Sequence, residues 1–176
     1  MSKIGTLLFL FALFAVLPST AQDRLFVSSE TPMIDGIVSA GEYSLEIEMR
    51  RAVLYVNRTE QILSVALQSE FDGWVAVGLG STRMDQASIY IGYVESGREV
   101  FAAELGRGHA HDSAPVVEPA EYRLTDSDEG TLLELSFPAE AIIPPGASTL
   151  SVIAACGKRD NLDSYHAVRK GLEIDL

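Results

Sequence analysis

The chain has 176 residues and carries 25 Asp and Glu against 13 Lys and Arg, which gives a formal net charge of −12 at pH 7. This acidic balance argues against nucleic acid and anionic membrane surfaces as partners, because both repel a protein of the same sign. A solvated acidic surface is the plain interpretation, and an acidic face for a basic redox partner is the alternative. The single cysteine, Cys156, excludes an internal disulfide.

The first 21 residues have the pattern of a secretory signal peptide. Lys3 precedes an unbroken apolar run at residues 7–17, and small residues follow up to Ala21. The run is shorter than the roughly 20 residues that cross a bilayer, so we predict no stable membrane anchor. We expect cleavage after Ala21. Residues 22–176 would then form a single domain that is exported to the periplasm or secreted.

Alternation of apolar and polar residues dominates the exported part, which predicts half-buried β-strands. In residues 43–49, for example, Leu45, Ile47 and Met49 share one face. Similar runs, separated by turn-forming segments, follow at residues 52–57, 61–68, 74–79, 88–94, 98–105, 120–125, 131–137, 150–156 and 172–176. One short helical turn is expected at residues 138–142. Many short strands at this spacing predict an antiparallel sandwich or barrel.

The connection at residues 80–87, GSTRMDQA, contains an unexpected methionine. We predict that residues 62–105 form a four-strand meander and that this connection is the loop at one of its ends. Turns are normally built from Gly, Ser, Asn, Asp and Pro, whereas Met84 lies between Arg83 and Asp85. By position alone, a loop methionine is more often a flap over the core than a ligand. Packing is sufficient to explain Met33 and Met49.

The three histidines and the cysteine are weak candidates when each is taken alone. His166 lies in a loop before the last short strand, where a surface or hydrogen-bonding role is usual. His109 and His111 would share one face of an extended segment and could bind Zn or Cu, but no third or fourth ligand is evident. A polar loop is the favoured interpretation of that segment. Cys156 is interpreted as a small buried hydrophobic residue.

Catalytic motifs are missing from the sequence. It contains no Gly-x-Ser-x-Gly, no His-Glu-x-x-His and no phosphate-cradling glycine loop ahead of a helix. We therefore predict a binding or electron-transfer domain and no enzyme.

Three segments together resemble the DOMON family, the dopamine β-monooxygenase N-terminal-like domains. They are residues 34–44 (IDGIVSAGEYS), residues 73–94 with the Gly-Trp strand and the methionine loop, and residues 154–176 with Tyr-His before a terminal strand. The resemblance implies an immunoglobulin-like antiparallel β-sandwich of roughly nine to eleven strands. Some members hold b-type haem between a methionine and a histidine, and others are thought to bind sugars. One departure is Ser88, where the family often has Asp; Asp85 is a possible replacement.

Carried over to this chain, the resemblance implies haem ligation by Met84 and His166. Arg169 would pair with a haem propionate, and Trp74 would be a core aromatic at the site, with sugar stacking as the alternative role. No Cys-x-x-Cys-His is present, so the haem b would be non-covalent. The implied function is electron transfer or redox sensing, with a membrane cytochrome, flavin or molybdenum enzyme as the redox partner. The alternatives are a metal-free carbohydrate or small-ligand module and a structural or adhesive sandwich.

Overall fold

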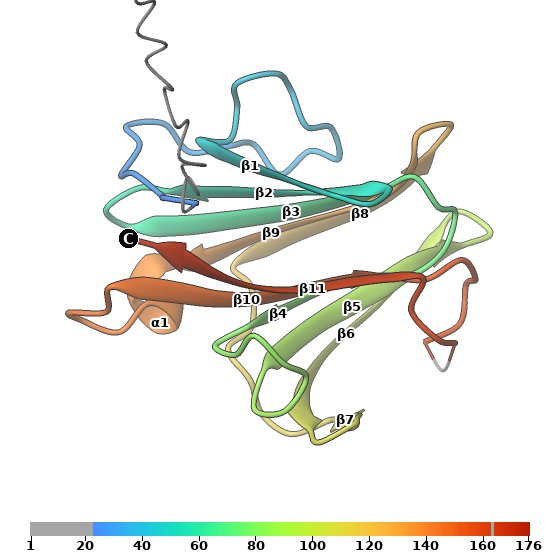
Figure 1. The fold of residues 1–176 in the computed structure, drawn as a ribbon. Helices are drawn as coiled ribbons and strands as arrows, with labels where there is room; N and C mark the ends of the chain where they lie inside the picture. The colour runs from blue at the N-terminus through green and yellow to red at the C-terminus, as the bar shows by residue number, and fades with distance from the viewer. Residues whose placement is uncertain (1–22, 163) are drawn as a thin grey trace, which may run out of the picture.

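The computed structural model describes residues 23–162 and 164–176, and the predicted signal peptide at residues 1–21 lies outside the described residues. Two antiparallel sheets lie face to face, which confirms the predicted β-sandwich (Figure 1). One sheet has the strand order β1-β2-β3-β9-β8. The bounds of these strands are β1 (Leu45–Met49), β2 (Ala52–Arg58), β3 (Ile62–Ser69), β9 (Gly130–Pro138) and β8 (Glu121–Ser127).

The other sheet has six strands in the order β11-β10-β4-β5-β6-β7. Their bounds are β11 (Val168–Asp175), β10 (Thr149–Cys156), β4 (Val75–Leu79), β5 (Ser88–Glu95), β6 (Arg98–Arg107) and β7 (Ala110–Asp112). The predicted helical turn is the helix α1 (Ala139–Ile142). No helix in the described ranges is long and apolar enough to cross a membrane.

The predicted four-strand meander is wrong at its first strand. β3 belongs to the five-stranded sheet, while β4, β5 and β6 are consecutive neighbours in the six-stranded sheet. Residues 70–74 therefore carry the chain from one sheet to the other. Thr131 fixes this crossing, because its Oγ1 accepts a hydrogen bond from the Gly73 N–H (3.1 Å) and its backbone N–H donates one to the Phe71 carbonyl (3.2 Å). The Thr131 hydroxyl itself donates to the Asp126 carboxylate (2.6 Å). Alternation predicts a strand and its buried face, but it does not name the neighbouring strand.

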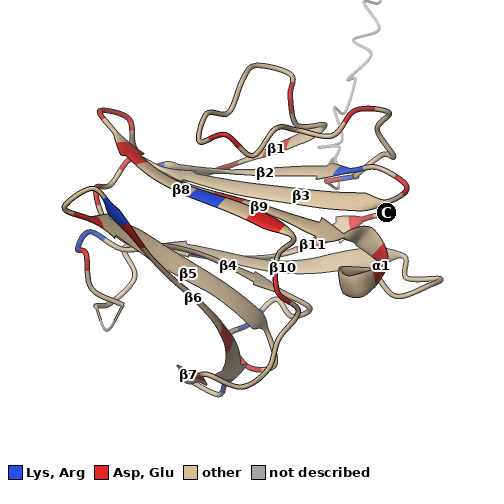
Figure 2. Ribbon diagram, turned by 180° about the vertical axis from the view of Figure 1, so that it is seen from behind, with Lys and Arg blue, Asp and Glu red and all other residues tan. Residues whose placement is uncertain are grey.

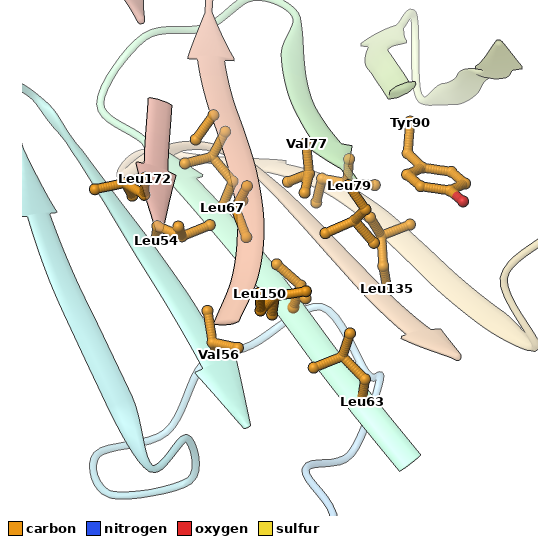
Figure 3. Close-up of a cluster of buried hydrophobic side chains, with 14 of the residues drawn as sticks. Leu54, Val56, Leu63, Leu67, Val77, Leu79, Tyr90, Leu135, Leu150 and Leu172 are labelled. Carbon is orange, nitrogen blue, oxygen red and sulfur yellow. The ribbon is translucent and has the colours of Figure 1, made fainter. Parts of the chain in front are cut away.

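The main core lies between the two sheets. Figure 3 shows leucine and valine side chains of both sheets meeting there, among them Leu54, Leu67, Val77 and Leu150. Cys156 is buried in this core, and burial raises the pKa of its thiol, as expected for a small hydrophobic residue. Met49 packs against the core, as predicted. The packing prediction for Met33 is wrong, because Met33 is 67% exposed.

A buried carboxyl group fastens the N-terminal segment to the outer face of the five-stranded sheet. Glu134 on β9 is fully buried and accepts hydrogen bonds from the Gly36 N–H (2.6 Å) and the Tyr43 hydroxyl (3.0 Å). Burial raises the pKa of Glu134, although these two hydrogen bonds oppose the shift. Burial and the neighbouring Glu134 likewise raise the pKa of Tyr43.

This raised pKa predicts that the Glu134→Gln variant changes how stability depends on pH. A carboxyl group whose pKa rises on folding stabilises most below its unfolded value of 4.5, and that contribution is lost as the pH rises through the folded pKa. As the pH rises above about 4.5, the wild type should therefore lose free energy of unfolding relative to the non-titrating glutamine variant. Urea unfolding of both proteins at several pH values measures the difference. A difference in free energy of unfolding between the two proteins that does not change with pH would contradict the prediction.

Candidate functional site

A groove of about 520 Å³ lies on the outer face of the six-stranded sheet, and we call it the outer groove. Side chains that point outward from alternate positions of the strands form the floor of the groove. Val75, Val77 and Leu79 point into the core, so Ala76 and Gly78 of β4 point outward. On β10, Ile153 and Ala155 face the same way. Ala76, Gly78 and Ala155 are small, so the floor of the groove lies low. Apolar side chains such as Ile89 and Ile91 also line the groove.

The methionine loop, residues 80–87, packs across this face from β11 at one end to β6 at the other. Near β11, a Cβ at Gly171 would overlap the Thr82 carbonyl, and near β6, a Cβ at Gly106 would overlap the Met84 carbonyl. Two hydrogen bonds fix the loop to β6. The Gln86 N–H donates to the Gly106 carbonyl (2.9 Å), and the Gly106 N–H donates to the Ala87 carbonyl (2.8 Å). Met84 is half-buried against the apolar cluster of the outer face.

Asp85 also anchors the methionine loop. Its Oδ1 accepts a hydrogen bond from the Gly108 N–H (2.7 Å) at the turn between β6 and β7. Ser88 is half-buried at the start of β5. The Asp85 carboxylate therefore fixes the methionine loop to the neighbouring β6–β7 hairpin.

The loop between β10 and β11 carries His166 to the opposite rim. It is anchored on Trp74: the indole Nε1 donates to Ser164 Oγ (2.8 Å), and the Gly157 N–H donates to the Trp74 carbonyl (2.8 Å). Gly157 is required there, because any Cβ would overlap the indole ring. The Tyr165 ring is 88% exposed and stacks on His166, with 4.8 Å between the ring centroids.

His166 is half-buried, and burial lowers the pKa of its imidazole, with a smaller contribution from the nearby Arg169 cation. The neutral imidazole is thereby favoured, and this is the form that ligates metals. Arg169 itself is exposed on β11 at the edge of the groove.

The structure brings the six candidate ligand and site residues of the sequence analysis to this one groove. Met84, His166, Arg169, Trp74, His109 and His111 all line it. Trp74 is only 6% exposed, which agrees with a core aromatic. Sugar stacking by Trp74 would need a ring with an accessible face. The floor residues Ala76, Gly78 and Ala155 were missed. Their signal is the run WVAVGL, whose outward positions are Trp, Ala and Gly where a solvated sandwich face would have polar residues.

The extended His109–His111 pair does not form. His109 lies in the turn that follows β6, and only His111 lies on a strand, β7. The His111 Nδ1 is hydrogen-bonded to the Glu104 carboxylate on β6. Within residues 23–162 and 164–176, no three His, Cys, Asp or Glu side chains gather as a metal-ligating group. The tight β6–β7 turn explains the difference, because His109 in the turn lacks the extended backbone that would align it with His111.

Removal of the indole N–H should loosen the His166 loop. In Trp74→Phe, the ring volume is largely kept but the bond to Ser164 is lost, so we expect the free energy of unfolding to fall by about 0.5–1.5 kcal/mol plus a packing term. Ser164→Ala removes the same bond from the other side and is the matched control. Chemical denaturation of both single variants and the double variant gives the coupling energy. A coupling energy of zero would contradict the anchoring role.

Comparison with solved structures identifies the architecture. A family 9 carbohydrate-binding module from Caldicellulosiruptor kristjanssonii, solved in complex with glucose, matches 88% of this chain and 95% of its own, with a TM-score of 0.53 and 12% identity. The structure of the module with cellotriose matches equally well, at a TM-score of 0.53. This chain shares the fold of that module. At such low identity the likeness concerns the fold alone.

Two cytochrome domains give lower scores. The cytochrome b domain of pyranose dehydrogenase from Coprinopsis cinerea is 15% identical, with a TM-score of 0.45 over 70% of this chain and 76% of that one. The cytochrome domain of Myriococcum thermophilum cellobiose dehydrogenase is 10% identical, with a TM-score of 0.46 over 74% and 80% of the two chains. No family model matches the sequence, and no curated protein matches it significantly.

Proposed function

We propose that this chain is a DOMON-type electron-transfer or redox-sensing domain that binds b-type haem non-covalently in the outer groove. One observation carries the proposal. A thioether, Met84, and an imidazole with a lowered pKa, His166, are held by two separate loops at one apolar groove. Methionine with histidine is a ligand set for haem iron.

The shape and lining of the groove fit such a group. Its volume of about 520 Å³ is typical of sites for small organic ligands and cofactors. The floor at Ala76, Gly78 and Ala155 lacks large side chains, so a flat apolar ring could lie against it. Arg169 stands at the edge, where a guanidinium could pair with a propionate carboxylate. Haem would supply one-electron chemistry, and Met/His ligation favours its reduced state.

Two side chains and their supporting contacts would hold the haem. His166 would donate a nitrogen lone pair, since burial and Arg169 favour its neutral form. Met84 would offer its sulfur from a loop that is pinned against Gly106. With Met84 and His166 both holding the haem, the group would supply one-electron transfer, and the domain would pass electrons. An exported location and a membrane cytochrome, flavin or molybdenum enzyme as partner are parts of the same proposal.

Haemin titration of residues 22–176, followed by absorption, tests the proposal. We expect saturation at one haemin per chain and a low-spin spectrum in both oxidised and dithionite-reduced protein. Ala155→Phe should block binding, because the new ring would fill the floor of the groove without replacing Met84 or His166. Circular dichroism checks that this variant is folded.

Failure of the wild-type chain to bind haemin in a saturable way would overturn the proposal. Calorimetry with glucose and cellotriose on the same sample then separates the alternatives. Sugar binding without haemin uptake would assign the groove to carbohydrate, and binding of neither would leave a structural or adhesive sandwich.

A further inference from the structure

A second hollow of about 550 Å³ lies beside the outer groove, on the other side of His166. Three parts of the chain meet around it: the turn between β1 and β2, the crossing from β3 to β4, and the loop between β10 and β11 (Figure 1). Ser164, Tyr165 and His166 line both the hollow and the groove, so one short segment separates the two. We call this second site the basic hollow.

The charge of the basic hollow is opposite to that of the protein. Four cations, Arg50, Arg51, Lys158 and Arg159, are among its ten described lining residues, and none of these ten is acidic. The chain as a whole has a net charge of −12. Figure 2 shows acidic segments over many loops and strand ends of the sandwich. In such a chain, cations gathered around a concavity and free of acidic lining produce a local positive field.

Most of these cations have no ion-pair partner in the described part of the chain. Arg51 is the exception, with its Nε 2.9 Å from a Glu70 carboxylate oxygen. Among the residues that the structure describes, Arg50, Lys158 and Arg159 form no such pair. Nearby acids lie outside the hollow. Asp160, for example, is surrounded by the charges of Asp126, Glu95 and Asp72, which add to burial in raising its pKa.

An aromatic side chain positions two of the cations. The Arg51 guanidinium lies 4.4 Å from the centroid of the Phe71 ring, and the Lys158 ammonium lies 5.2 Å from it. Cation–π contacts at these distances restrain long side chains that would otherwise be mobile in solvent. The positive charges are therefore partly preorganised, which lowers the entropy lost when they bind a ligand.

We propose that the basic hollow binds a small anion that carries two or more phosphate or carboxylate groups. Guanidinium groups match the oxygen pairs of both, and lysine adds a point charge. Four cations around one hollow favour a multiply charged ligand over a single carboxylate. The volume of the hollow fits a small molecule. The four cations line only the basic hollow and not the outer groove, so this proposal does not rest on haem binding.

Calorimetric titration of the chain with inorganic pyrophosphate and with citrate, at about 100 mM salt, tests the proposal. We expect saturable binding of at least one probe at one site, and the stronger probe indicates whether phosphate or carboxylate is preferred. Lys158→Gln/Arg159→Gln should weaken binding at least tenfold. Arg98→Gln/Arg123→Gln removes the same charge from exposed positions outside the hollow, and it should weaken binding less than twofold.

Three results would overturn the proposal. The first is the absence of saturable binding by both probes at millimolar concentration. The second is equal weakening by the two double variants, which would mark a general effect of net charge. Backbone NMR shifts on titration should fall on Arg51 and Ala167 and spare Gly106, and shifts elsewhere would also overturn it. Arg50→Gln provides a second variant should the double variant fail to fold. None of these outcomes bears on haemin uptake, so the two proposals fail separately.

Discussion

Replacement of His166 by alanine is expected to abolish low-spin haem in the chain and to weaken haemin binding at least tenfold, which corresponds to about 1.4 kcal/mol. The physical reason is that imidazole is the stronger of the two proposed ligands, and that the lowered pKa of His166 keeps it available near neutral pH. Met84→Ala should keep more of the haem but convert it to a high-spin form, since a thioether is the weaker ligand. Absorption spectra of reconstituted variants check both results.

The control for these substitutions is Met33→Ala. Met33 is exposed, far from the groove in sequence and outside its lining, so its removal should leave the spectrum and the affinity unchanged. Added imidazole should restore a low-spin spectrum in His166→Gly, because the free ligand can enter the space left by the side chain. A His166→Ala protein with an unchanged low-spin spectrum would contradict ligation by this residue.

Substitution of Gly106 by valine should displace the methionine loop and lower the stability of the chain. Any Cβ at this position would overlap the backbone of Met84, which is not a flexible side chain end, so the methionine loop must move. Two hydrogen bonds between Gly106 and the loop would be strained at the same time. We expect the free energy of unfolding to fall by about 2–4 kcal/mol, in the range of severe packing errors.

Thermal or urea unfolding measures this loss. Arg107→Ala is the matched neighbour, because its side chain is exposed and its ion pair with Asp112 lies at the surface, so its cost should stay near 0.5 kcal/mol. If Gly106→Val were as stable as the wild type, the loop would not be pinned against β6 as described. A stable variant that has lost the low-spin spectrum would indicate that the loop had moved away as a unit.

The strands were predictable because their side chains alternate, and alternation depends only on local geometry. The prediction failed where pairing partners mattered. The crossing from β3 to β4 depends on Thr131, which lies some sixty residues further along the chain, and no local pattern reports such a contact. The short strand β7 was missed for a similar reason, since it is defined by its pairing with the end of β6.

Among the residues that line the outer groove, Met84 could be selected from the sequence because it is a methionine in a polar loop. The residues that shape the floor were missed because alanine and glycine at outward positions carry no chemistry of their own. Gly106, Gly157 and Gly171 matter through the backbones packed against them, and this information exists only in three dimensions. The basic hollow is likewise assembled from three separate segments, so the charge pattern of any one of them looks ordinary.

The central claim is that Met84 and His166 hold one haem for electron transfer, and a potentiometric titration of the reconstituted chain tests it most directly. We predict a single reversible one-electron transition with low-spin spectra at both ends. In Met84→His, the potential should fall, because replacing the soft sulfur by a second imidazole favours oxidised iron. A high-spin spectrum in either redox state of the wild type, or a potential unchanged in Met84→His, would contradict the account.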